Sequence, residues 1–579
     1  MPFSSIQEEE EALGSWPRRL LHVKSLTSYE WQPGNVYGGI KEPEYNAISY
    51  TWGRFRLKPG VSPEVQPLPF EGINWREHLP RMDPNYFTME EFQNLINTAT
   101  TYRLDESYGD QLVTKPVDFL WLDIACVDQN PSEPRSAAEI GRQALIYRGA
   151  QAVFVWAVTL LPNRHDHVFG NIEWWGVDPA EHTAETIQEP TKAMLDFLEV
   201  LHDPWFSSLW TLQEAFLRPN AIILTRPAQP IFYKVYGETS LLTLRHMLVW
   251  GVNADGFCTK RGAINSGEGL FVKIKDVINE KGLVALRANN TMALLGAATN
   301  RKCFMPEDRV YGIQQVFGFR LGKSSLQAEP GKEYTLEELE DQLGEALLIQ
   351  EPILSQTHVF LEPVPYADRW KINACSAVPY NLQSINTSKT GNVETQASFW
   401  VDDSNSWKKA VRWKGPTTLL SNIAEYALWE LGETAPEADD EESWRSYLLN
   451  IFPDVTDEFL QSPYYRSPPS STPIPKGRES YIFAQWLDKR YSRQKVGVLF
   501  LGNIQENEQR QGLVIGLILV QQGKETWSRV GVCQWWIPKF SEEKEFFEGK
   551  SEEWKHDEGI LGYVESTKNP GTHAIGGFI

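Results

Sequence analysis

The stretch VDFLWLDIACVDQNP spans residues 117–131. Its first six residues are mostly apolar, as is typical of a strand that is buried on both faces of a parallel sheet. Asp123, Asp128 and Gln129 follow directly and mark the exit of that strand into a polar loop. We expect this strand to be one of several in an α/β domain, because similar apolar runs occur on either side of it.

Three further strands are predicted by short apolar runs, at residues 45–50, 152–158 and 221–225. Helical patterns separate these runs. Thr88 with Glu91 and Ser136 with Glu139 each have the spacing of a capping box at a helix start, and another helix is expected after Pro204. Strands that alternate with helices predict a parallel sheet, whose ligands lie beyond the carboxyl ends of the strands.

The sequence changes character after about residue 230. Helical patterns continue to about residue 330, and strand-like runs at 496–501, 513–521 and 527–536 predict a β-rich C-terminal part. A charged linker is expected near residues 432–442 and a proline-rich linker near 462–475.

The composition excludes several classes of protein. The chain has 55 Lys and Arg against 76 Asp and Glu, a net charge of −21, which argues against binding nucleic acid through phosphate neutralisation. The longest strong apolar run is the eight residues 513–520, short of the roughly 18 needed to span a membrane. No signal peptide is recognised at the N-terminus. The five cysteines are widely spaced without a C-x-x-C pair, so we expect no disulfide framework and no metal site, and a cytoplasmic location.

Polar residues follow the predicted strands in three segments, residues 50–54, 123–129 and 207–214. Together they predict one pocket edge at the carboxyl ends of the sheet. Another interpretation stays open, in which the tryptophans are core residues and the aspartates cap helices or satisfy loop amides. The candidate binding residues are Trp52, Gly53, Arg54, Trp121, Asp123, Asp128, Gln129 and Trp210.

Three blocks of this sequence closely resemble the blocks of the fungal heterokaryon-incompatibility (HET) domain. They are YNAISYTWG at 45–53, FLWLDIACVDQN with RQALIYRGAQAVFVWA at 119–130 and 142–157, and PWFSSLWTLQEA at 204–215. RKCFMPEDRVYGI at 301–313 is similar to a block that often follows this domain. The resemblance implies a lead-in at 1–39, a HET domain at 40–230, a helical region packed on it at 231–330 and a mixed α+β region at 331–579.

HET domains are in turn similar to TIR domains, which implies a TIR-like (flavodoxin-like) parallel sheet. The block SLWTLQE at 208–214 resembles the one that carries the catalytic glutamate in TIR domains that cleave NAD, and it places Glu214 at that position. A carboxylate there would stabilise the oxocarbenium-like state that forms as the nicotinamide–ribose bond breaks. In this interpretation Trp52 or Trp121 holds the nicotinamide and Arg54 meets the pyrophosphate. A helix carboxylate or a salt-bridge partner is the alternative role for Glu214.

The resemblance therefore implies a protein of self/non-self recognition and programmed cell death, a form of innate immunity, with NAD as substrate and no bound cofactor. The alternative is a non-catalytic module that triggers death by assembling with partners. Activity is expected to need self-association, an unknown protein partner or incompatibility factor, and release from restraint by the regions after residue 230.

Overall fold

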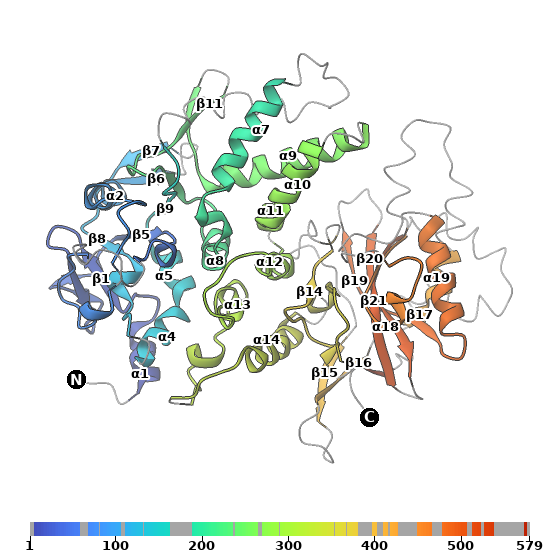
Figure 1. Ribbon diagram of the computed structural model, residues 1–579. Helices are drawn as coiled ribbons and strands as arrows, with labels where there is room; N and C mark the ends of the chain where they lie inside the picture. The colour runs from blue at the N-terminus through green and yellow to red at the C-terminus, as the bar shows by residue number, and fades with distance from the viewer. Residues whose placement is uncertain are drawn as a thin grey trace. The chain divides into compact units, whose positions relative to one another are not determined.

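The computed structural model places two units of the chain (Figure 1). The first unit comprises Met1–Arg287 and Asn300–Leu339, and the second comprises Ala288–Thr299 and Glu340–Ile579. The residues that the structure describes are 5–57, 68–79, 81–105, 111–130, 133–161, 188–235, 238–264, 269–288, 290–329, 331–351, 354–365, 368–379, 382, 396–401, 409–414, 417–425, 449–465, 478–505, 512–522, 526–537 and 572–575. The linker expected near 432–442 lies outside these residues, and so does most of the linker expected near 462–475.

The first unit is built on a six-stranded sheet in the order β10-β9-β5-β8-β1-β2. Neighbours among the first four strands are parallel, whereas β1 is antiparallel to β8 and β2 is antiparallel to β1. The strands are β10 (Ile222–Leu224), β9 (Val153–Trp156), β5 (Tyr45–Ser49), β8 (Phe119–Trp121), β1 (Arg19–His22) and β2 (Thr27–Glu30). Every residue of the four parallel strands is buried, which confirms the prediction of a parallel sheet covered on both faces.

Helices cover both faces of this sheet (Figure 1). Helix α2 (Met89–Thr101) packs on one face, against β5, β8 and β9, and α5 (Gln143–Gly149) and α8 (Leu209–Leu217) lie on the other. The two latter helices contact each other. The capping box predicted at the start of α2 is confirmed, because Thr88 Oγ accepts from the Glu91 N–H and the Glu91 carboxylate accepts from the Thr88 N–H.

The second predicted capping box is wrong. Helix α4 (Pro134–Ile140) begins before Ser136, with proline in its first turn and the Glu133 side chain accepting from the Arg135 N–H. Glu139 is instead fully buried, where it accepts from the backbone N–H of Arg18 at 2.8 Å and from the Arg142 guanidinium at 3.2 Å. Glu139 therefore connects the N-terminal residues to the sheet domain.

Short elements complete the first unit. Residues 1–39, expected as a lead-in, contribute β1 and β2 to the main sheet. The others are α1 (Ile6–Leu13), β3 (Val36–Tyr37), β4 (Ile40–Lys41), η1 (Trp52–Arg54), η2 (Arg76–His78), β6 (Tyr102–Asp105), β7 (Gln111–Thr114), α3 (Asp123–Cys126), α7 (Gln188–Leu201), η6 (Pro204–Ser207), β11 (Phe232–Val235), β12 (Glu238–Leu241), α9 (Leu244–Ile264), α10 (Gly269–Glu280), α11 (Leu283–Ala288), α13 (Asp308–Tyr311), η7 (Gln314–Val316) and η8 (Gly322–Ser324).

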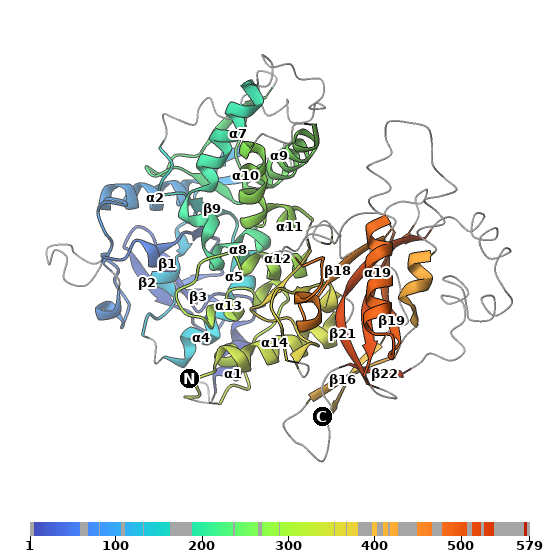
Figure 2. The same ribbon diagram turned by 45° about the vertical axis from the view of Figure 1, so that its right-hand side comes forward.

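The second unit contains an eight-stranded sheet. Its centre is the antiparallel series β19 (Val496–Gln505), β20 (Gly512–Gln521) and β21 (Thr526–Ile537), as the sequence predicted. Helix α19 (Arg478–Arg490) packs on this sheet through Phe483, Ala484 and Leu487 (Figure 2). The remaining elements are α12 (Thr291–Ala298), α14 (Leu336–Gln350), η9 (Leu354–Gln356), β13 (Val359–Phe360), β14 (Ser376–Ala377), β15 (Gln396–Val401), β16 (Lys409–Lys414), β17 (Thr417–Leu419), β18 (Leu449–Pro453), α18 (Asp457–Leu460) and β22 (Thr572–Ile575).

Among the described residues, no helix has both the length and the apolar character needed to cross a bilayer. In the same part of the chain, no group of three or more His, Cys, Asp and Glu side chains is arranged to hold a metal ion.

Candidate functional site

Four elements meet at the carboxyl ends of the central parallel strands. Strand β5 ends at Ser49, and its neighbour β8 is followed by Asp123, the first residue of α3. On the covering helices, α5 supplies Tyr147 and α8 supplies Glu214. These side chains interact with one another, so the sequence segments around residues 50, 123 and 214 do form one site.

Glu214 is held by hydroxyl groups from two other elements. The Ser49 hydroxyl donates a hydrogen bond to its carboxylate, and the Tyr147 hydroxyl bonds to it as well. The indole N–H of Trp205 donates to Ser49 Oγ at 2.7 Å. Because Ser49, Tyr147 and Trp205 are all buried, the carboxyl group of Glu214 has a fixed position at the end of β5.

Burial is the main cause that raises the pKa of Glu214, and the negative charge of Asp123 acts in the same direction, while hydrogen bonds from Ser49 and Tyr147 oppose them. The resulting pKa is about 8. The carboxyl group is therefore mainly protonated at neutral pH. Glu214 and Asp123 are each only partly buried as residues, whereas Ser49, Tyr50 and Tyr147 are buried. A carboxyl group with a strongly shifted pKa beside a second carboxylate is a typical feature of a functional site.

Asp123 lies between the helix start and a buried tyrosine. Its carboxylate accepts from the backbone N–H of Ile124 at 2.7 Å, in the first turn of α3. Burial raises the pKa of Tyr50 well above its ordinary value, and the adjacent Asp123 charge adds to that effect. The phenol of Tyr50 thus stays protonated beside the carboxylate.

The loop after α3 is held by its own polar residues. Asp128 accepts from the Asn130 N–H at 2.8 Å, and its backbone carbonyl accepts from the Ser136 hydroxyl at 2.7 Å. The Gln129 amide donates to the Val127 carbonyl at 2.8 Å. These contacts shape the loop beside Asp123, and they match the interpretation in which Asp128 and Gln129 satisfy loop groups.

Two of the three predicted tryptophans, Trp121 and Trp210, have other contacts in the structure. Trp121 is fully buried and packs edge-on against Tyr147, with ring centroids 5.5 Å apart, so it presents no face to a ligand. Trp210 is partly accessible and hydrogen bonds to Asp308. Trp52 lies in η1, and its side chain is outside the described residues.

Arg54 and Gly53 also lie in η1, just beyond β5. Gly53 is exposed, whereas the guanidinium of Arg54 donates to the Ser207 carbonyl at 3.0 Å and to the Ser207 hydroxyl at 3.2 Å. Burial lowers the pKa of Arg54. Arg54 therefore fixes the segment that leads into α8.

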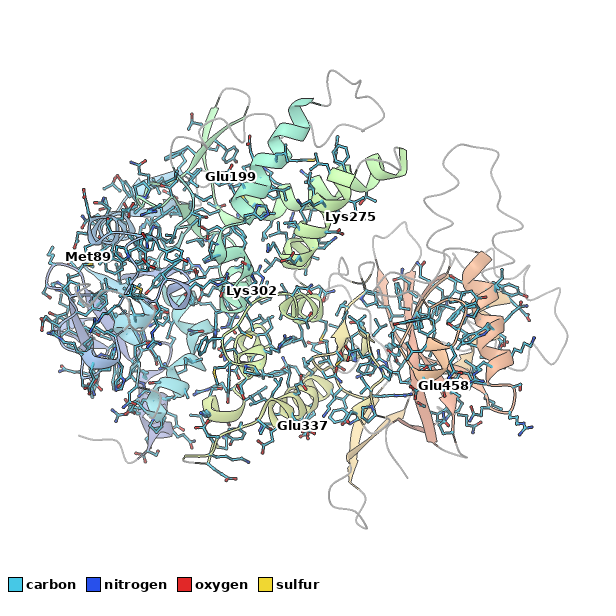
Figure 3. The ribbon with its side chains drawn as sticks, viewed as in Figure 1. Met89, Glu199, Lys275, Lys302, Glu337 and Glu458 are labelled. Atoms are coloured by element: carbon cyan, nitrogen blue, oxygen red, sulfur yellow. The ribbon has the colours of Figure 1, made fainter. Side chains whose placement is uncertain are left out.

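The segment at residues 301–302 reinforces the start of α8, a contact that the sequence did not reveal. Arg301 is buried and donates to the carbonyls of Ser208 and Lys281, at 3.0 and 2.5 Å. Lys302 pairs with the backbone on both sides of Ser208, and Figure 3 shows it beside α8. The downstream block thus positions the helix that carries Glu214.

Comparison with protein families identifies the region that contains this site. Residues 45–214 match the family model of heterokaryon incompatibility protein (HET). The chain therefore carries a HET domain, as the sequence blocks predicted, and Ser49, Asp123, Tyr147 and Glu214 all lie inside it. No curated protein and no solved structure matches the chain.

Sequence reasoning missed three of the residues that define the geometry: Ser49, Tyr147 and Trp205. Each is an ordinary core residue by its sequence context. Ser49 is 165 residues from Glu214, so only the folded sheet brings the two together. The one available signal was the apolar face of the 143–149 helix, on which Tyr147 lies.

Proposed function

We propose that the protein acts in self/non-self recognition and programmed cell death in the cytoplasm, and that its HET domain cleaves the nicotinamide–ribose bond of NAD. The HET match indicates a role in heterokaryon incompatibility. The observation that carries the catalytic part is the Glu214 carboxyl group, held by Ser49 and Tyr147 beside Asp123.

The order of the parallel strands supports a TIR-like, flavodoxin-like domain. Numbered along the chain, the four strands lie in the order 2-1-3-4, and chain order reverses between the first and third, β5 and β9. Doubly wound sheets bind nucleotides outside the carboxyl ends of the strands at such a point. Ser49 ends the first of these two strands, so Glu214 has the right place for a nucleotide substrate.

The charge state of Glu214 fits the cationic nicotinamide ring of NAD. When the bond from the nicotinamide nitrogen to ribose C1 breaks, its electron pair stays on nicotinamide and positive charge develops on the ribose. A cation near Glu214 favours the ionised carboxyl and lowers its pKa, so a proton leaves as the substrate binds. The ionised Glu214 and the neighbouring Asp123 then stabilise the developing charge until water adds to C1 and releases its proton.

The experiment is NAD consumption by the purified full chain at high concentration, because self-association is part of the proposal. Glu214→Gln keeps the shape of the side chain and removes its charge, so we expect a loss of at least about 100-fold. Glu90→Gln, an exposed carboxylate on α2, is the matched control and should keep full activity. Turnover that survives Glu214→Gln would show that Glu214 is not catalytic.

A pH profile adds a second measurement. Since the ionised form of Glu214 is the reactive one, kcat/KM should rise with pH and level off above an apparent pKa near 8. A profile that is flat between pH 6 and 9 would contradict this role.

The alternative function, a non-catalytic module that assembles with partners, is favoured by a different observation. Phe304 and Met305 are 93% and 50% exposed, directly after the segment that pairs with the start of α8. An exposed aromatic side chain next to the firmly held start of α8 suits contact with a second copy of the chain. If Phe304→Ser abolishes both self-association and cell death while no NAD is consumed, this alternative holds and the catalytic proposal fails.

A further inference from the structure

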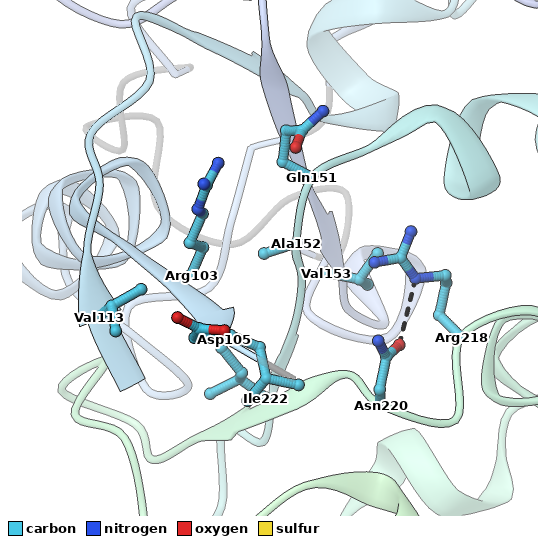
Figure 4. Close-up of a pocket in the computed structure, with 10 residues that line it drawn as sticks. Arg103, Asp105, Val113, Gln151, Ala152, Val153, Arg218, Asn220 and Ile222 are labelled. Atoms are coloured by element: carbon cyan, nitrogen blue, oxygen red, sulfur yellow. Dashed lines mark hydrogen bonds between the residues drawn. The ribbon is translucent and has the colours of Figure 1, made fainter. Parts of the chain in front are cut away.

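A pocket of about 310 Å³ lies at the amino-terminal ends of the parallel strands (Figure 4), whereas Glu214 lies at their carboxyl ends. Its walls come from the amino-terminal ends of β9 and β10, the hairpin strands β6 and β7, and the residues after α8. Because it is formed at the amino ends of the strands, it is separate from the candidate site at their carboxyl ends. Its size is at the lower end of the range for small-molecule sites, about 300 to 1,000 Å³.

Two arginines contribute to this pocket from different elements. Arg103 comes from β6, and its side chain is only 20% exposed, with a carboxylate oxygen of Glu44 3.7 Å away. Arg218 follows α8, and it lines the same pocket as Arg103 and Gln151 (Figure 4). Two guanidinium groups on a concave surface favour an anion, although the chain as a whole carries a net charge of −21.

Arg218 is fixed before any ligand arrives. Its guanidinium donates to the carbonyls of Tyr147 and Ala150, both at 2.8 Å, and to the Asn220 side chain at 3.3 Å. A guanidinium held in this way loses little side-chain entropy when an anion binds. With its Nε and Nη1 donors engaged in these contacts, the guanidinium places a fixed positive charge beside the pocket, which attracts a phosphate or carboxylate.

Asp105 gives the pocket a second chemical preference. It lies on the same lining as the two arginines and is partly accessible. A carboxylate repels a bare polyanion but accepts hydrogen bonds from hydroxyl groups. A ligand that matches both kinds of lining residue carries an anionic group, which binds the arginines, and hydroxyl groups, which donate to Asp105.

We propose that this pocket binds a small phosphorylated sugar, with the phosphate between Arg103 and Arg218 and a hydroxyl on Asp105. Binding to this pocket does not depend on whether the HET domain cleaves NAD. The two proposals therefore fail separately, and the pocket is testable in the Glu214→Gln variant.

The test is calorimetric titration of the full chain with ribose 5-phosphate, inorganic phosphate and ribose. We expect ribose 5-phosphate to bind more tightly than inorganic phosphate, and ribose alone to show no binding. Arg103→Gln should weaken the binding of ribose 5-phosphate by about tenfold or more, because it removes a charge-assisted hydrogen bond. Arg81→Gln, an exposed arginine of the same unit, is the control and should bind as the parent does.

Asp105→Asn tests the sugar part of the ligand by itself. It should weaken the binding of ribose 5-phosphate and leave the binding of inorganic phosphate unchanged or slightly tighter. Equal thermal melting of parent and variants shows that the fold is intact. Inorganic phosphate that binds as tightly as ribose 5-phosphate, and depends on Arg103, would overturn the sugar part of the proposal. No binding of either anion, or binding unchanged by Arg103→Gln, would overturn the site itself.

Discussion

Replacing Glu214 by glutamine should stabilise the HET domain at high pH and have little effect at low pH. Its pKa is about 8 in the folded chain, above the ordinary value of 4.5. Between these two values the folded state holds a proton that the unfolded state has released, so stability falls as pH rises from about 4.5 to 8. Glutamine does not titrate, so Glu214→Gln avoids this loss.

The pKa values set the size of the effect. At 1.36 kcal/mol per pH unit, the gap between 4.5 and about 8 corresponds to about 5 kcal/mol as an upper limit. Part of the side chain is accessible, and water there screens the ionised form. We therefore expect Glu214→Gln to gain about 2 to 3 kcal/mol at pH 8.5 and less than about 1 kcal/mol at pH 5.

The assay is hydrogen exchange of the amides in β5 and β9, corrected for the intrinsic effect of pH on exchange. A local readout is needed because the chain has two units, and one global midpoint would mix their stabilities. Glu90→Gln, which removes an exposed carboxylate, serves as the control at both pH values. A gain from Glu214→Gln that is equal at pH 5 and pH 8.5, or that is absent at pH 8.5, would refute the reasoning.

Three further outcomes are expected. Ser49→Ala removes a hydrogen bond to Glu214 and leaves the Trp205 indole N–H without its acceptor, so it should cost about 1 to 3 kcal/mol in hydrogen-exchange stability. It should also raise the apparent pKa of the kcat/KM profile, and an unchanged profile would contradict the contact. Arg529→Ala leaves the buried carboxylate of Asp454 without its ion-pair partner and should cost about 3 to 5 kcal/mol in the hydrogen-exchange stability of β20 and β21, whereas a loss below about 1 kcal/mol would argue against a buried pair. A thiol reagent should modify two cysteines of the native chain before the other three, because those three are buried and should react only after unfolding; a fast phase of more than two thiols would contradict the structure. The two reactive residues are Cys303 and Cys375.

The sequence predicted the parallel strands because each is buried on both faces and so reads as an uninterrupted apolar run. It did not predict β1 (RLLH) and β2 (TSYE), which are short and partly exposed and carry no such run. The order of the strands was also beyond it, since pairing is decided by contacts between distant segments. The error at Ser136 arises because Glu139 turns into the interior, where it contacts Arg18 and Arg142 instead of the start of the helix.

For the site, the polar residue after a buried strand indicated Asp123, and the resemblance to TIR domains indicated Glu214. The structure brings these two side chains together, whereas it places Trp121 in the core. An aromatic residue next to a strand end is equally suited to a core and to a pocket, and only its packing against Tyr147 distinguishes the two. The hydroxyl of Ser49 had no signal at all, because its role depends on Glu214 approaching from another element.

The raised pKa of Glu214 connects the stability of the domain with its proposed chemistry. In the resting chain, ionising this carboxyl group is unfavourable because it is mostly buried and lies near Asp123. In the proposed reaction, the cationic nicotinamide ring of NAD reverses that balance, because its positive charge lies near the carboxylates. Ionisation of Glu214, which is unfavourable in the empty site, then becomes favourable, and the same negative charges stabilise the cation that develops on the ribose.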